Sequence, residues 1–179
     1  LGVLARKYGL NLPGAIQLVY LGADAGGYVG AFQAKMIDAA MPFEPAGAML
    51  EQKKLGGILV NLMSGDVEQF RDLNFMGVAT SPDLIKSNPV LVKKVVAVFA
   101  EAQQILLDPS QGKKIMAQEF PQMEPATNER SYELLSQIWS KDGRMTLEGG
   151  KKVYDFLQPP GDKKIEFEKT FTNDFLPAK

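Results

Sequence analysis

The sequence predicts an α/β fold, a parallel sheet flanked by helices. Helical and strand-like patterns alternate along residues 1–62, and the connections between them are two to six residues long. The strand-like segments are short apolar runs at 16–21, 36–40 and 58–62. Alternation of this kind indicates parallel strands with helical crossovers.

The expected elements of the first half follow in order. A helical pattern over residues 1–8 ends at Gly9, and the turn 11–14 leads to a strand at 16–21. A glycine-rich turn then opens a helix that runs through Lys35. A strand at 36–40, a helix reaching 53 or 54 and a strand at 58–62 complete the unit, in which the three strands should lie parallel. Residues 74–80 should form a further strand that leaves this unit.

The second half is predicted to be mainly helical. Asn88 and Pro89 suit an N-cap and a first helical position, and apolar residues at helical spacing continue to about residue 107. Residues 108–112 should end that helix. Thr127 can cap the next helix, whose stripe includes Trp139 as a core residue. Thr146 opens a short helix to about residue 157, and an extended charged tail follows from residue 158.

Composition excludes several classes of function. The chain has 179 residues, a net charge of -1, no Cys and no His. Without these residues there is no disulfide, no thiol nucleophile, no Ser-His-Asp triad and no His or Cys metal site. The balanced charge argues against nucleic acid as a partner, and no apolar run approaches the ~20 residues of a membrane span. We therefore expect no cofactor, no metal and no catalytic residue.

Three segments carry a resemblance to a known family. Residues 31–40 read AFQAKMIDAA, residues 77–93 read GVATSPDLIKSNPVLVK, and residues 171–176 read FTNDFL. In order and spacing they resemble substrate-binding proteins of ABC importers, in the group that includes sulfonate, taurine and thiamine-precursor binders. Lys35 departs from the pattern, because the family commonly has Gly there.

The resemblance implies a type II periplasmic-binding-protein-like fold with an incomplete two-lobe architecture. Residues 1–73 would be the remainder of the second lobe, and residues 74–179 the crossing strand and helical part of the first. Because the sequence starts within a helical pattern, we interpret it as amino-terminally truncated. The implied function is capture of a small polar or heteroaromatic molecule between the lobes and its delivery to an ABC permease. The implied location is the periplasm or the cell surface, and no reaction is catalysed.

The candidate ligand-binding groups lie in loops at the expected strand ends. Backbone amides and hydroxyls there suit an anionic or polar group, Glu44 suits an amine or a ring N–H, and the aromatic rings suit stacking. A buried Glu44 would need water or a nearby donor. The alternatives are a solvated turn residue at 44 and glycines that only permit a tight turn. The candidates are Asp24, Gly26, Gly27, Tyr28, Phe43, Glu44, Thr80 and Ser81.

Two other functions remain open from the sequence. One is a stand-alone α/β enzyme that draws on Asp24, Asp38 and Glu44, although no second acid or base stands at a recognisable spacing from any of them. The other is a truncated fragment without a competent binding site. In a truncated chain the apolar face of the 88–107 helix would be uncovered, so we also expect a homodimer that covers this face.

Overall fold

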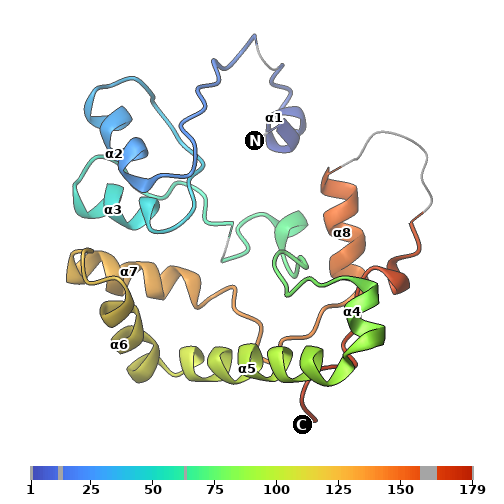
Figure 1. Cartoon of the computed structure of the whole chain (residues 1–179). Coiled ribbons are helices and arrows are strands. Elements are labelled where there is room, and N and C mark those ends of the chain that lie inside the picture. The colour runs from blue at the N-terminus through green and yellow to red at the C-terminus, as the bar shows by residue number, and fades with distance from the viewer. Residues whose placement is uncertain (1, 12–13, 63, 158–164, 179) are drawn as a thin grey trace. The chain divides into compact units, whose positions relative to one another are not determined.

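The computed structural model describes residues 2–11, 14–62, 64–157 and 165–178, and its described elements are all helical (Figure 1). The α-helices are α1 (Gly2–Lys7), α2 (Ala25–Gln33), α3 (Ala46–Gln52), α4 (Pro82–Ser87), α5 (Pro89–Leu107), α6 (Pro109–Glu119), α7 (Pro125–Leu135) and α8 (Leu147–Leu157). Two 3₁₀ helices, η1 (Glu68–Phe70) and η2 (Phe167–Lys169), complete the set. Within these ranges, no helix has the length and apolar character of a membrane span.

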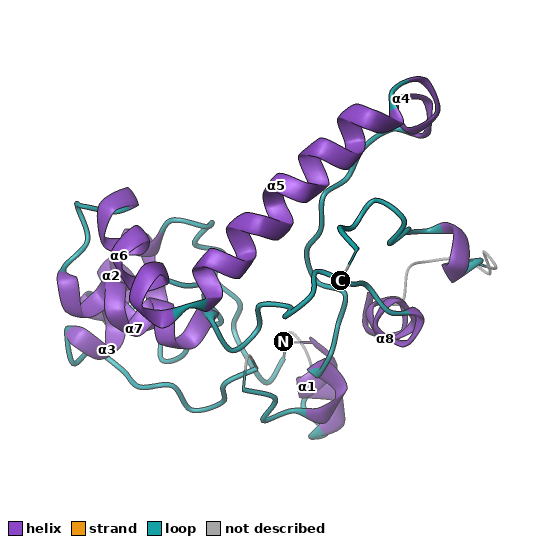
Figure 2. Ribbon diagram, turned by 90° about the horizontal axis from the view of Figure 1, so that it is seen from below, coloured by secondary structure: helices purple, strands orange, loops and turns teal. Residues whose placement is uncertain are grey.

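The predicted α/β fold with a parallel sheet is wrong. Figure 2 shows helices and loops, and the described residues contain no β-strand. The segments 16–21, 36–40 and 58–62 form turns or extended loops, and residues 74–80 form no crossing strand. Because the described residues form no sheet, the αβαβαβ unit expected in residues 1–73 is also wrong. The type II periplasmic-binding-protein-like fold is wrong for the same reason.

The exposure of these segments gives the physical reason. Leu59 is 95% exposed, Tyr20 91% and Met76 85%, so their side chains contribute little to any buried layer. A strand is stabilised by cross-strand hydrogen bonds and by packing on its neighbours, and its propensity depends on that context. A short apolar run has the propensity to form a β-strand, but it does not show whether a neighbouring strand is present.

Several helix boundaries agree with the sequence prediction because a local hydrogen bond fixes them. Asn88 caps α5 by accepting from the backbone N–H of Leu91 at 3.1 Å, and Pro89 occupies the first turn. Thr146 caps α8 by accepting from the N–H of Gly149 at 2.9 Å. Lys35, in place of the glycine that the resemblance leads one to expect, still adopts a left-handed φ of 55° after α2. There the N–H of Met36 bonds to the carbonyl of Ala31 at 2.9 Å, which closes a Schellman turn.

Two expectations about the second half are corrected. Residues 108–112 do end α5, but they also begin α6, since Asp108 Oδ1 accepts from the N–H groups of Ser110 and Gln111. Thr127 is not a cap, because it lies inside α7 and is buried. The extended surface expected from residue 158 falls partly on 158–164, outside the described residues. Beyond them, η2 lies within the expected tail.

The chain divides into two compact units, each of which is described by itself. Unit 1 comprises residues 1–60 and 116–135, and unit 2 comprises residues 61–115 and 136–179. In unit 1, α3 lies between α2 and α7 (Figure 1) and supplies a large part of the buried surface. Its core side chains include Val29, Ala31, Ala46, Ala48, Leu50, Tyr132 and Leu134. The core of unit 1 is therefore helix against helix.

In unit 2, aromatic pairs hold α8 to the segments around it. The rings of Phe70 and Phe156 meet edge to face with centroids 5.0 Å apart, and those of Tyr154 and Phe167 do so at 5.7 Å. Edge-to-face pairs at such distances add stabilisation beyond the buried area alone. These contacts tie η1, α8 and η2 together.

Candidate functional site

Glu44 stands in the loop immediately before α3, where its half-buried carboxylate caps that helix. Its Oε2 accepts a hydrogen bond from the backbone N–H of Ala48 at 3.1 Å. The same oxygen accepts one from the hydroxyl of Ser131, on α7, at 3.4 Å. A carboxylate at a helix amino terminus is favoured by the free N–H groups there. The expectation that a buried Glu44 has a nearby donor is confirmed.

The second carboxylate oxygen of Glu44 remains open. Oε1 has no hydrogen-bond partner among the described residues, and the buried side-chain atoms that lack a partner do not include it, so water can reach it. The oxygen lies against Gly47, where an added methyl group would overlap it. One oxygen is thus anchored by the protein, and the other is available to a donor from solution.

Two charged residues, Glu51 of α3 and Arg130 of α7, act electrostatically on this carboxylate. Arg130 Nε donates to Glu51 Oε2 at 2.7 Å, and a second guanidinium nitrogen reaches Glu51 Oε1 at 3.4 Å. Arg130 also pairs with Glu133 at 3.5 Å. The hydrogen bond to Glu51 raises the pKa of Arg130 further. The guanidinium therefore interacts mainly with Glu51 and Glu133 rather than with Glu44.

Burial raises the pKa of Glu44 above its ordinary value. Desolvation is the largest cause; the hydrogen bonds from Ala48 and Ser131 oppose it, and the charge of Glu51 reinforces it. The ionised form of Glu44 is therefore less favourable in the folded chain than in the unfolded chain. A bound cationic or N–H donor would reduce this desolvation cost by compensating the negative charge.

Protonation of Glu44 should stabilise unit 1. The raised pKa means that the folded chain binds this proton more tightly than the unfolded chain. Its contribution is therefore fully present below about pH 4.5 and is lost as the pH rises through the raised pKa. Glu44→Gln, which is neutral at every pH, should remove this part of the pH dependence. Urea denaturation of both proteins between about pH 4 and pH 8 checks the expectation, and equal pH slopes would contradict it.

The other residues predicted for unit 1 take largely structural places. Asp24 caps α2 by accepting from the N–H of Gly27 at 2.8 Å, so that amide is already engaged. The hydroxyl of Tyr28 donates to the carbonyl of Gly22 at 3.0 Å, which closes the turn before α2. Gly26 lies in the first turn of the same helix, where an added methyl group would stand 3.1 Å from the Asp24 carboxylate.

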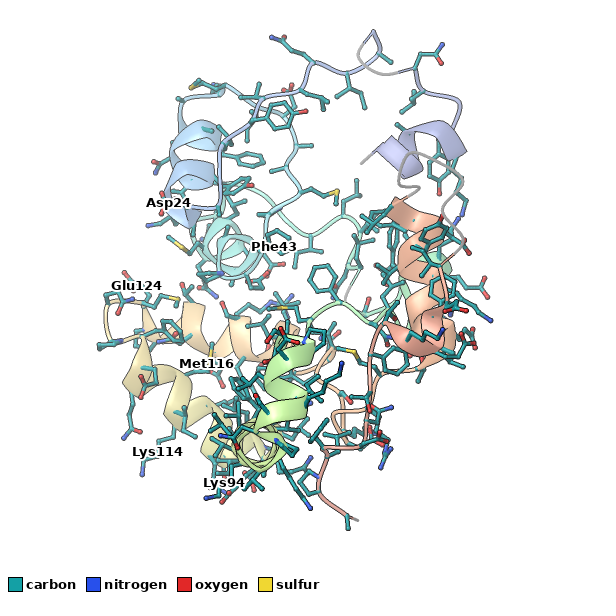
Figure 3. The ribbon with its side chains drawn as sticks, turned by 45° about the vertical axis from the view of Figure 1, so that its right-hand side comes forward. Asp24, Phe43, Lys94, Lys114, Met116 and Glu124 are labelled. Carbon is teal, nitrogen blue, oxygen red and sulfur yellow. The ribbon has the colours of Figure 1, made fainter. Side chains whose placement is uncertain are left out.

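Phe43 precedes Glu44 in the chain and is 71% exposed. Figure 3 labels Phe43 beside α3 and Asp24 beside α2. An exposed aromatic side chain next to a carboxylate with an open oxygen offers a stacking surface and a hydrogen-bond acceptor within one loop. Phe43 and Glu44 are thus neighbours in one loop, an exposed aromatic residue followed by a half-buried carboxylate.

Thr80 and Ser81 belong to unit 2, whereas the other six predicted residues belong to unit 1. Ser81 caps α4 by accepting from the N–H of Leu84 at 3.2 Å. Its hydroxyl therefore has a structural role at the start of that helix. Thr80 is exposed in the preceding loop.

The carboxylates considered for an enzyme do not form an acid-base group. Asp24 is engaged at the start of α2, and Asp38 is an exposed loop residue. The charges that act on Glu44 come from Glu51 and Arg130, not from either aspartate. In the described part of the chain, no cluster of three or more acidic side chains is arranged to hold a metal ion.

The residues of α7 that complete the site could not be predicted from the sequence. Ser131 lies 87 positions from Glu44, and Arg130 lies 79 positions from Glu51, so no local pattern could pair them. Asn128, one turn before Ser131, is buried; its amide donates to the carbonyl of Phe120 at 3.1 Å, while Oδ1 has no hydrogen-bond partner. Only the fold of unit 1 brings Ser131 to Glu44 at the amino-terminal end of α3 and Arg130 to Glu51 near the carboxyl-terminal end of that helix.

Comparison of this chain with family models, with curated proteins and with solved structures finds no match.

Proposed function

We propose that this chain binds a small solute bearing an amine or a ring N–H and releases it unchanged, as the solute-binding component of an ABC importer. Glu44 is the recognition group, and Phe43 is the stacking surface beside it. The resemblance of segments 31–40, 77–93 and 171–176 supports the transport role, the permease partner and a periplasmic or cell-surface location. The proposal does not require a sheet or a cleft between two lobes.

The observation that carries the proposal is the asymmetric bonding of Glu44. Oε2 is held by Ala48 and Ser131, which fixes the orientation of the carboxylate, while Oε1 accepts no bond from the described residues. A fixed acceptor binds a donor with less loss of conformational entropy than a mobile one. Because desolvation already disfavours the bare charge, a cationic or N–H donor gains more here than at a solvated carboxylate.

Binding without catalysis fits the neighbours of this carboxylate. Ser131 is the hydroxyl nearest to it by hydrogen bonding, and only 1% of Ser131 is exposed, so a substrate cannot reach it. Arg130 is engaged with Glu51 and Glu133. A general acid or base acts with a second group within hydrogen-bond reach of the reacting atoms, and this site presents a single open acceptor.

The test is calorimetric titration with three solutes: taurine, 4-aminopyrimidine and ethanesulfonate. Taurine and 4-aminopyrimidine carry amino groups, whereas ethanesulfonate has the sulfonate of taurine without its amine. We expect at least one amino compound to bind, and Glu44→Gln to weaken it by about tenfold, the scale of one charge-assisted hydrogen bond. Glutamine keeps an acceptor for Ala48, so the fold of α3 should persist.

Glu119→Gln is the matched control, because Glu119 is an exposed carboxylate of the same unit at the end of α6. It removes the same charge and should leave affinity unchanged. Gly47→Ala should weaken binding as Glu44→Gln does, since its methyl group occupies the space of Oε1. No heat with either amino compound, or equal affinity in the Glu44→Gln protein, would exclude Glu44 as the recognition group.

A further inference from the structure

Helix α5 of unit 2 carries an uncovered apolar stripe. Its members recur at alternating spacings of four and three residues, which places them along one side of a helix. Val98 is 66% exposed at the middle of the stripe, and a shallow hollow lined by Lys94, Val95, Val98 and Phe99 lies there. The stripe consists of Leu91, Val95, Val98, Ala102 and Ile105.

The rest of unit 2 holds α5 by other sides of the helix. The side-chain amide of Gln103 donates to the carbonyl of Ser140, and that of Gln104 donates to the carbonyl of Lys141 at 2.8 Å. Val92, which is next to Leu91 in sequence but about 100° away around the axis, is the buried residue of this helix. The packing that fixes α5 in its unit therefore leaves the stripe free.

Two opposite charges flank the stripe on the same side. Lys94 and Glu101 are separated by seven residues, or about 10.5 Å along the axis, too far apart to pair with each other. Neither side chain makes a hydrogen bond or an ion pair with the described residues. Figure 3 labels Lys94 on this helix. Each therefore has a charge free for a partner from outside the chain.

We propose that this face binds a second copy of the chain, with the two α5 helices antiparallel and related by a two-fold axis between residues 96 and 97. In this register Val95 faces Val98 of the second copy, and Leu91 faces Ala102 of the second copy. In an antiparallel pair, a flanking position of one helix faces the same heptad position of the other helix. Lys94 is then about two residues, or 3 Å, from the level of Glu101 of the second copy, and the symmetry forms this ion pair twice.

The charges select this orientation. In a parallel in-register pair, Lys94 would lie beside Phe99 of the other copy, and neither Lys94 nor Glu101 would meet an opposite charge. The antiparallel pair buries the same stripe and compensates both charges. One helix face is smaller than the roughly 800 Å² per partner of a standard interface, so we expect a dissociation constant in the micromolar range.

The test is sedimentation equilibrium of the chain and of charge-exchanged variants. Lys94→Glu places two like-charged pairs across the two-fold, as does Glu101→Lys, and each should weaken dimerisation by about tenfold. The double variant Lys94→Glu/Glu101→Lys restores opposite charges and should dimerise within about threefold of the unaltered chain. Recovery in the double variant depends on the antiparallel contact, because a parallel pair would not bring these positions together.

Lys93→Glu is the control, since Lys93 is exposed on α5 but lies on the side away from the stripe. It changes the net charge as Lys94→Glu does and should leave the dimer intact. Val98→Glu should give a monomer with an unchanged far-UV circular dichroism spectrum. A chain that stays monomeric near millimolar concentration would overturn the proposal, as would a double variant no better than the single ones.

Discussion

Leu134→Ala is expected to lower the free energy of unfolding by about 3 kcal/mol. Leu134 lies on α7 and is 1% exposed, so truncation to alanine leaves a cavity in the helix-against-helix core of unit 1. The cost combines the lost transfer free energy of the side chain with that of the cavity, because the surrounding helices relax only in part. Urea denaturation followed by circular dichroism at 222 nm measures it.

Leu59→Ala is the matched control for this prediction, and it also tests the corrected fold. Leu59 is 95% exposed, so the same truncation should change the unfolding free energy by less than about 0.5 kcal/mol. In the parallel sheet predicted from sequence, Leu59 would lie in a buried strand and its truncation would match that of Leu134. Comparable losses in the two variants would contradict the exposed loop conformation of residues 58–62.

Local chemistry explains which elements could be predicted from the sequence. Asn88 and Thr146 place their caps through hydrogen bonds that reach three residues along the chain, so the starts of α5 and α8 follow from short patterns. Lys35 and Lys54 end α2 and α3 in left-handed conformations without glycine. At the ends of α2 and α3 a lysine therefore takes the left-handed position that glycine usually occupies, so no glycine marks either end in the sequence.

The strands could not be predicted correctly, because an extended apolar run has the same appearance with or without a neighbouring strand. Residues 16–21 and 58–62 carry the right composition, yet their backbone groups do not form a ladder within the described residues. At Asp108, by contrast, an element was missed. Asp108 comes directly after α5, and its side chain caps α6. A pattern that ends one helix was not recognised as the start of the next.

The candidate site divides in the same way. Glu44 was predicted because a carboxylate in a proline-bounded turn before a helix is visible in the sequence. Its anchor on Ser131, and the Arg130–Glu51 pair beside it, depend on the packing of α3 against α7. Contacts between residues so far apart in the sequence depend on the tertiary fold. The sequence predicted a different fold, so these contacts could not be predicted.

Gly149→Ala should lower the free energy of unfolding by about 2 kcal/mol, although alanine is the better helix former. An added methyl group would stand 2.6 Å from the backbone carbonyl oxygen of Asp72 and 2.5 Å from Asn74 Oδ1. Asn74 cannot easily move aside, because it donates to the carbonyl of Thr146 at 2.7 Å and accepts from the N–H of Thr146 at 3.1 Å. The methyl group must therefore force the 72–74 segment away from the first turn of α8.

Gly150→Ala makes the same chemical change one position along α8 and should have the opposite effect. The nearest atoms to its methyl group would be Asn74 Nδ2 at 3.6 Å and a ring carbon of Phe167 at 3.7 Å, both ordinary contacts. The gain in helix propensity should then stabilise the chain by up to about 1 kcal/mol. Thermal and urea denaturation of the two variants side by side measure the difference. If both variants are stabilised alike, residues 72–74 do not pack on α8 as the hydrogen bonds of Asn74 require.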